Sequence, residues 1–258
     1  MAKKAFLGVV TLVAIFFIFL AFGVNAPEQQ DASNTVFIRD ITECAKSNVT
    51  GINYGSWTSA SRTCKLTADL NESVVIAVSD TTLDCSGHNI TGKGAFGSIG
   101  ILASNKTNIT IKNCVAQKFS DGITLRLTNQ SLLSNNTARN NNFYGFFFTF
   151  SSNNTITNNT AENNGFSGFI LESFSSNNTY KNNFAINNSY GFTISGSSSR
   201  ANILNNNIAT NNSAGFTIYS SYNLLTFNIA KDNRGEFGGG GISVGSHNNT
   251  LANNTMLK

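Results

Sequence analysis

The sequence is poor in the side chains that bind metals. Its 258 residues include two His, two Met and four Cys. Copper-transfer sites need several His, Met or Cys ligands, but His88 and His247 lie far apart and Met256 is the only Met besides the initiator. The four Cys form no Cys-x-x-Cys pair, the spacing typical of zinc sites. We therefore expect no metal site and no cofactor.

Charge is also scarce, because only 12% of the residues are Asp, Glu, Lys or Arg. The formal net charge of +4 includes Lys3 and Lys4, so the chain from residue 27 onward carries +2. Proteins that bind nucleic acid gather Lys and Arg into a patch or stripe. No such stripe occurs, so we do not expect nucleic acid as a partner.

Carboxylates are too scattered for an obvious active site. A calcium-dependent lyase needs clustered carboxylates, and a glycosidase needs a pair of carboxylates flanking the scissile bond. The 13 Asp and Glu form no such cluster in the sequence, and neither His has the context of a Ser-His-Asp triad. A site assembled from neighbouring turns stays open as an alternative, with Asp121, Arg126 and Glu172 as candidate catalytic residues.

Asparagine, by contrast, is abundant and periodic. A nine-residue block, apolar-x-x-Asn-x-Ala-x-x-Asn, recurs from Leu133 to the end of the chain without insertions inside it. Asn tolerates the left-handed backbone of tight corners, and stacked Asn side chains hydrogen-bond along a column. We expect the central Asn of each block to form a structural ladder: Asn136, Asn159, Asn183, Asn207, Asn228 and Asn254.

Glycines mark the same period. They stand at 100, 122, 145, 168, 191, 215 and 241, in steps of 22 to 26 residues, with apolar residues one and three positions later. This alternation predicts a strand with one buried face, and the period predicts a solenoid, propeller or array. Three short strands per turn favour a parallel β-helix, with strands ~4.8 Å apart. Asn-rich chains can instead be disordered or prion-like, but the apolar columns argue against that.

The segments LDCSGHNITG, GILASNKTNITIKNC and the repeated GF-x-I and NNT motifs resemble the NosD-type right-handed β-helix proteins, a group with carbohydrate-binding and sugar-hydrolysis repeats. The resemblance covers residues 70–258. It implies an all-β, right-handed parallel β-helix of about eight turns of 22–26 residues with an N-terminal cap. The copper association of the group does not carry over, because the ligands are missing. The fold serves lyases, hydrolases, epimerases, adhesins and structural spikes, so it does not decide function.

The N-terminus reads as a targeting segment. Residues 1–26 combine Lys3 and Lys4 with an apolar run over 5–24, which suits a cleaved signal peptide or, since its length could span a bilayer, a membrane anchor. We expect a linker and cap over 27–70 and the coil over 71–258. The rest of the chain is then extracellular or on the cell surface, with the membrane reached only through residues 5–24 if these are not cleaved. No C-terminal cap is visible, which makes self-association through an open end an alternative.

Four cysteines in an exported chain predict two disulfides. Three pairings exist. Cys44 with Cys64 would pin the cap, and Cys85 with Cys114 would bridge neighbouring turns. Asn-x-Ser/Thr sequons are dense as well, and exposed ones would carry glycans in a glycosylating organism.

The outward positions of the first strand in each turn combine aromatic rings, hydroxyls and a few charges. Such a face suits a polysaccharide or cell-surface glycan, although it could equally pack against the N-terminal segment, a loop or another subunit. We predict an exported, cell-surface or secreted protein that is non-catalytic and has a structural or glycan-binding role. The alternatives are a polysaccharide lyase or glycoside hydrolase on this face, and a self-assembling surface protein. The glycan-binding candidates are Arg126, Tyr144, Phe147, Glu172, Tyr190, Tyr219, Arg234 and Glu236.

Overall fold

The computed structural model describes residues 35–38, 44–47, 51, 53–196, 198–235 and 240–258. The expected targeting segment, residues 1–26, and Glu236 lie outside this part of the chain. The regular secondary structure of the described residues is almost entirely β-strand, and the helix among them is one short 3-10 turn, η2 (Ser59–Ser61). A search of the same residues for a helix long and apolar enough to cross a membrane finds none.

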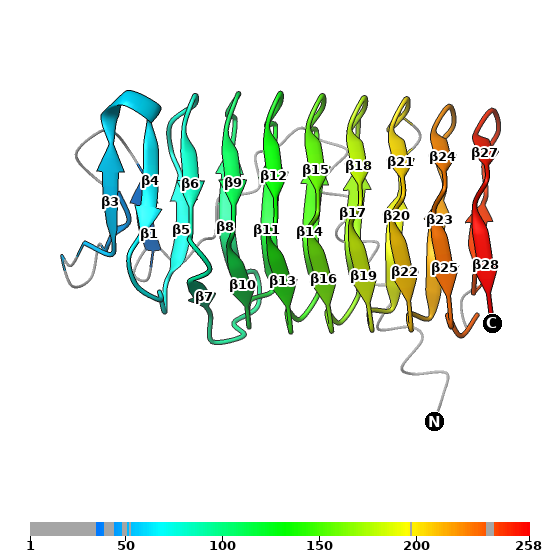
Figure 1. Ribbon diagram of the computed structural model, residues 1–258, viewed down its shortest axis with the longest axis horizontal. Helices are drawn as coiled ribbons and strands as arrows, with labels where there is room; N and C mark the ends of the chain where they lie inside the picture. The colour runs from blue at the N-terminus through cyan, green and yellow to red at the C-terminus, as the bar shows by residue number, and fades with distance from the viewer. Residues whose placement is uncertain (1–34, 39–43, 48–50, 52, 197, 236–239) are drawn as a thin grey trace. The chain divides into compact units, whose positions relative to one another are not determined.

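The strands form three sheets, which run along the coil (Figure 1). Sheet A has ten strands: β2 (Lys46–Ser47), β1 (Thr35–Ile38), β5 (Ser73–Ile76), β8 (Ile99–Ser104), β11 (Asp121–Arg126), β14 (Tyr144–Thr149), β17 (Ser167–Glu172), β20 (Tyr190–Ile194), β23 (Ala214–Ile218) and β26 (Ile242–Val244). Sheet B has ten: β27 (Thr250–Ala252), β24 (Leu224–Thr226), β21 (Ile203–Asn205), β18 (Thr179–Lys181), β15 (Thr155–Thr157), β12 (Leu132–Ser134), β9 (Thr110–Lys112), β6 (Thr82–Asp84), β4 (Thr63–Leu66) and β3 (Gly55–Thr58). Sheet C has eight: β28 (Thr255–Leu257), β25 (Ile229–Lys231), β22 (Ile208–Thr210), β19 (Phe184–Ile186), β16 (Thr160–Glu162), β13 (Thr137–Arg139), β10 (Val115–Gln117) and β7 (Asn89–Thr91).

From β5 onward, successive strands of the chain belong to sheets A, B and C in turn, so each full turn of the coil adds one strand to every sheet. β11, β12 and β13 make one such turn, and β14, β15 and β16 make the next. Neighbouring turns pair in parallel and in register, as in Ile123 with Phe146 and Phe146 with Phe169. The predicted parallel β-helix of about eight turns is therefore confirmed, since sheet C holds eight strands.

The core is a set of apolar columns, because equivalent residues of successive turns stack. Phe146, Phe169, Phe192 and Phe216 form one column, with adjacent ring centroids 4.6, 4.7 and 4.8 Å apart and planes within 5° of parallel. This spacing equals the ~4.8 Å between paired strands. The column is buried, with side chains at most 2% exposed. Burying each ring contributes roughly 2–3 kcal/mol to folding.

The repeated glycine stands where the chain enters sheet A, and the reason is close packing. A Cβ on Gly145 would lie 2.6 Å from the carbonyl oxygen of Gly168 and 2.9 Å from the Cβ of Ala161. Any side chain there would force the next turn away, so the repeat pairs this glycine with the alanine of its nine-residue block.

The predicted Asn column lies at the corner between sheets B and C. From Asn136 to Asn254, each Nδ2 donates to the Oδ1 of the next Asn at 2.9–3.1 Å. Two more columns occupy the other corners, and they were not named from the sequence as ladders. One runs from Asn141 to Asn233 and the other from Asn154 to Asn249. All three corners are thus held by buried amides.

The N-terminal end of the described coil is closed by antiparallel pairing. β3 pairs antiparallel with β4, and β4 then pairs in parallel with β6. Sheet A begins earlier than the coil expected from residue 71, because Thr35–Ile38 pairs in parallel with Ser73–Ile76.

Two disulfides join the cysteines, in the arrangement considered from the sequence. Cys44 bonds to Cys64 in the cap, and Cys85 bonds to Cys114 across neighbouring turns. Disulfides persist in oxidising compartments, so the pair of them supports an exported protein.

Candidate functional site

The outer face of sheet A carries most of the residues predicted to form a site. Within β11, Ile123 and Leu125 belong to the core, whereas Thr124 and Arg126 belong to the opposite face of the sheet, as strand alternation requires. Asp121 is the first residue of the strand and does not belong to the core cluster. Pairing with β14 places Tyr144 beside Asp121 and Thr149 beside Arg126. Because the strands pair in parallel register, equivalent residues of successive turns lie side by side. Asp121, Thr124 and Arg126 each belong to one such column.

The first column leads into a group of aromatic rings, which we call the aromatic strip: Phe96, Phe143, Tyr144, Phe147, Phe166 and Tyr190. Tyr144 stands at its centre, with ring centroids 5.1 Å from Phe147 and 5.9 Å from Phe166. Phe166 continues the strip to Tyr190 at 5.2 Å. The strip extends over several turns at the edge of sheet A where its strands begin.

Three rings of this strip were missed in the sequence. Phe143 and Phe166 are more than a third exposed, and Phe96 is 82% exposed. The signal was available for two of them, because Phe143 and Phe166 each stand two residues before the repeated glycine, at Gly145 and Gly168. Phe96 follows no such rule, and its 5.9 Å edge-to-face contact with Phe143 depends on the folded chain.

The second feature of the face is a pair of carboxyl groups. In the strands of sheet A the charged residues are Lys46, Asp121, Arg126 and Glu172. Burial raises the pKa of Asp121 to about 7, and repulsion from Glu172 adds to the shift, while a hydrogen bond from the Tyr144 backbone opposes it. Burial likewise raises the pKa of Glu172, against a hydrogen bond from Ser195. Asp121 begins β11 and Glu172 ends β17, with β14 between the two strands, so the acids stand toward opposite edges of the face.

Tyr144 lies within the field of both acids. Burial raises the pKa of its hydroxyl, and the charges of Glu172 and then Asp121 raise it further. Its phenol therefore stays protonated and can donate a hydrogen bond. Two acids with raised pKa values and a neutral phenol can exchange protons and bind hydroxyl groups.

Arg126, the third candidate catalytic residue, stands apart from this group. It is aligned with Thr149 and then Glu172 across two strand pairs. Within the described part of the chain, no ion pair joins Arg126 to either acid. The register thus places Arg126 in the same column as Glu172, whereas Asp121 stands at the other end of β11.

The middle column of the face is more buried than a solvent-facing column should be. Thr124, Ile170 and Thr217 are 2–3% exposed, and Thr193 is 7% exposed. Ile170 is buried although it does not belong to the main core cluster. The Thr124 hydroxyl is buried and has no hydrogen-bond partner among the described residues. The more accessible side chains of the face therefore lie along its edges, as Tyr144 and Arg126 do.

The remaining candidates lie toward the C-terminal end of the face. Tyr219 directly follows β23 and is 55% exposed. Arg234 is exposed and lies beyond β25, away from the acids in the sequence. Phe147 is half-buried in the strip. Glu236 lies outside the described residues, so the loop from 234 to 240 cannot be placed in the site.

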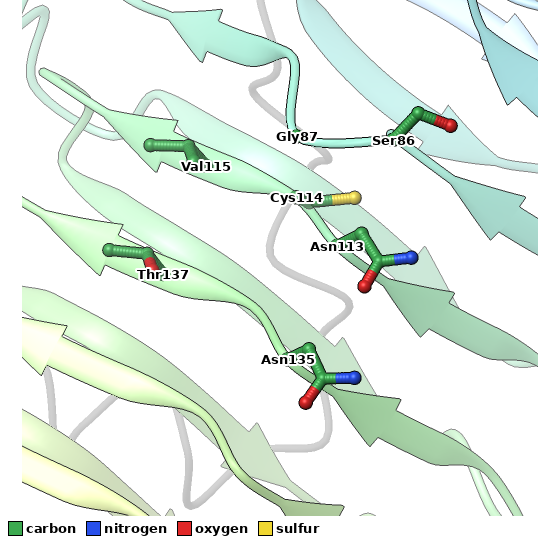
Figure 2. A pocket seen from close by; sticks show the side chains of 7 residues that line it. All are labelled: Ser86, Gly87, Asn113, Cys114, Val115, Asn135 and Thr137. Carbon is green, nitrogen blue, oxygen red and sulfur yellow. The ribbon is translucent and has the colours of Figure 1, made fainter.

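A separate hollow of about 460 Å³ lies where β6, β9 and β12 turn toward sheet C (Figure 2). Its lining side chains are small or amide-bearing, and Cys114 is held in a disulfide. None of them titrates, so this hollow lacks acid–base groups of the kind found on sheet A. The lining residues are Ser86, Gly87, Asn113, Cys114, Val115, Asn135 and Thr137.

The family model for the right handed beta helix region matches residues 47–208 and, in a second overlapping placement, residues 99–256. The chain belongs to the right-handed β-helix family. The handedness expected from the sequence is therefore confirmed, and the resemblance to NosD-type proteins is consistent with this family. No curated protein matches the sequence.

Three solved β-helix structures resemble the chain. The periplasmic alginate epimerase AlgG aligns with a TM-score of 0.61 at 19% identity, over 74% of this chain and 49% of that protein, so the chain spans about half its length. The A-module of mannuronan C-5 epimerase AlgE4 from Azotobacter vinelandii gives 0.51 at 17% identity, over 75% and 72%. The alginate lyase from Paenibacillus sp. str. FPU-7 gives 0.50 at 11% identity, over 87% and 98%. At these identities the likeness concerns the fold alone.

Proposed function

We propose that this β-helix binds polysaccharide on the outer face of sheet A, along the aromatic strip. The observation that carries the proposal is the chain of ring contacts from Phe143 through Tyr144 and Phe166 to Tyr190. Partly exposed rings offer apolar surface to the C–H faces of sugars, and their hydroxyls offer hydrogen bonds. The neighbouring Asp121 and Glu172 supply acceptors for sugar hydroxyls.

The fold neighbours are compatible with this proposal, because two are epimerases and one is a lyase whose names refer to alginate or mannuronan. The proposed setting is outside the cell, as a secreted or surface-attached protein, in line with the two disulfides. Residues 5–24 would supply the export signal or the anchor.

Retention of the full-length protein on immobilised cellulose, mannan and mannuronan tests the proposal. Binding to at least one polymer is expected, and Phe166→Ala should weaken it about tenfold by removing a ring that is not in the core. The matched control is Phe227→Ala, which removes a 54% exposed ring outside sheet A. Failure of the parent protein to bind any of the three, or equal losses in the two variants, would refute the proposal.

A second candidate function is catalysis at the same face. The observation that favours it is the buried carboxyl group of Asp121, aligned with Tyr144 on the next strand, whose pKa burial raises to about 7. A general acid or base works best with a pKa near the operating pH. If the protein is a lyase or hydrolase, incubation with the same polymers will produce new chain ends, and both Asp121→Asn and Glu172→Gln will abolish them. If the parent protein is retained on a polymer but produces no new chain ends, it binds polysaccharide without cleaving it, and the catalytic function is refuted.

A further inference from the structure

Two phenylalanines outside the aromatic strip stack at the opposite end of the sheet A strands. Phe150 directly follows β14, and Phe174 follows β17 by two residues. Their ring centroids are 5.8 Å apart and their planes differ by 16°. Phe174 is 62% exposed, and Phe150 is half-buried. The pair is therefore a flat apolar surface that the core does not use.

The backbone at both positions has a conformation that bulky residues disfavour. Phe150 has φ of 52° and Phe174 has φ of 57°. At this corner the preceding turns have Asn105, which suits the left-handed region, and then Leu127, which is also 47% exposed. A left-handed conformation costs a non-glycine residue roughly 1–2 kcal/mol. Exposed rings thus stand where Asn would fold with less strain.

The Phe150–Phe174 pair adjoins the carboxyl-bearing column of sheet A. Thr149 precedes Phe150, and Glu172 stands two residues before Phe174. Phe150 stands six positions after Tyr144 of the aromatic strip, which is roughly 20 Å along an extended strand. The two groups of rings therefore bound the same face at opposite edges, with Glu172 near one and Asp121 near the other.

We propose that Phe150 and Phe174 form a second sugar-stacking platform, so that a bound polysaccharide crosses sheet A from the aromatic strip to this corner. This inference rests on the proposed function. It adds that the glycan runs across the sheet, along the strand direction, and that it must be long enough to reach both groups of rings. A short oligosaccharide reaches one platform only, whereas a longer one spans both. A glycan that ran along the coil axis would meet one platform whatever its length.

The test compares oligosaccharides of three and eight residues, from the cello-, manno- and mannuronate series, by calorimetric titration of the full-length protein. Phe174→Asn should weaken binding of the octasaccharide about tenfold, the loss expected for one stacking contact. Binding of the trisaccharide to the strip should stay within twofold. Phe166→Ala should weaken both lengths.

Asn is chosen at position 174 because it accepts the left-handed backbone, so that folding is preserved. The melting temperature of Phe174→Asn should equal or exceed that of the parent. Phe227→Asn is the matched control, since Phe227 is 54% exposed with φ of 56° at another corner. Phe227→Asn should change the melting temperature in the same direction as Phe174→Asn, and it should leave the affinities for the trisaccharide and the octasaccharide unchanged.

The outcomes separate the two proposals. If the parent protein binds none of the oligosaccharides and no polymer, the proposed function fails. If it binds them but Phe174→Asn leaves the octasaccharide affinity unchanged, or weakens both lengths equally, the second platform is refuted and the strip alone binds sugar. Selective loss of the octasaccharide supports a glycan that crosses the sheet.

Discussion

The side-chain amide of Asn159 donates a hydrogen bond to the side-chain oxygen of Asn183, one turn further along the coil, at 3.1 Å. The same Nδ2 bonds to the carbonyl oxygen of Leu133 on the preceding turn at 2.9 Å. Its Oδ1 accepts from the backbone of Asn136 at 2.9 Å. One side chain thus ties three turns together without contact with water.

Replacing this residue should therefore destabilise the coil strongly. Asn159→Ala removes the donor to Leu133 and the acceptor for Asn136, leaving buried polar groups unpaired, at a cost of about 2–4 kcal/mol. Chemical denaturation monitored by circular dichroism measures the change. The control is Thr155→Ala at an exposed strand position, which should cost less than about 0.5 kcal/mol. Equal stability of the Asn159→Ala variant and the parent would contradict a structural ladder.

The Tyr180 hydroxyl presents the opposite case, a buried polar group that gains nothing from its position. Its ring packs edge-to-face on Phe148 and Phe169, and its oxygen has no hydrogen-bond partner among the described residues. Tyr180→Phe should raise the free energy of unfolding by about 1 kcal/mol, because a desolvated hydroxyl is removed and the ring remains. Tyr180→Ala, which empties the site, should lower it by about 3–5 kcal/mol. A lower stability of Tyr180→Phe would show that the hydroxyl is satisfied.

Both disulfides should be present in the isolated protein. Thiol labelling after unfolding without reductant is expected to find no free sulfhydryl, since the described cysteines are all paired. Replacing Cys85 and Cys114 together by Ala should lower stability by about 2–4 kcal/mol, because the bond closes a loop between residues 29 apart. Labelling of two thiols per chain would disprove one of the pairs.

Asp121 should make stability depend on pH. Its folded-state pKa of about 7 lies above the unfolded value of 3.8. The folded state therefore holds the proton more tightly, and this contribution is complete below pH 4 and lost as pH rises through 7. We expect a loss on the order of 2 kcal/mol, reduced from the full shift because the carboxyl is only partly buried. Asp121→Asn should flatten the stability profile between pH 4 and 7, and an unchanged slope would rule out this origin.

Most of the architecture followed from periodicity, because a coil repeats the same contacts in every turn. The Gly, Phe, Asn and Ala registers predicted which residues stack, and the Phe146–Phe169 and Asn159–Asn183 contacts join neighbouring repeats as that reasoning requires. The third Asn column, through Asn154 and Asn178, had the same spacing in the sequence but was not singled out. The start of sheet A at Thr35–Ile38 was also missed, since it precedes the regular repeat.

The site was less predictable, because its properties arise between columns. Asp121 and Glu172 stand 51 positions apart in the numbering, and nothing local to either shows that their charges interact. The contact of Phe96 with Phe143 and the stack of Phe150 on Phe174 depend equally on how corners of different turns meet. The burial of Thr124 and Ile170 on the outer face likewise depends on what surrounds them in the folded chain.

The sequence by itself determined the coil: its period, its inward columns and its corner amides, because each is set by residues that repeat at a constant spacing. Only the tertiary structure decided the chemistry of the outer face. The pKa of Asp121, the aromatic strip and the strained Phe150–Phe174 pair depend on desolvation and on distances across turns. These quantities vary from turn to turn, so no repeat pattern encodes them.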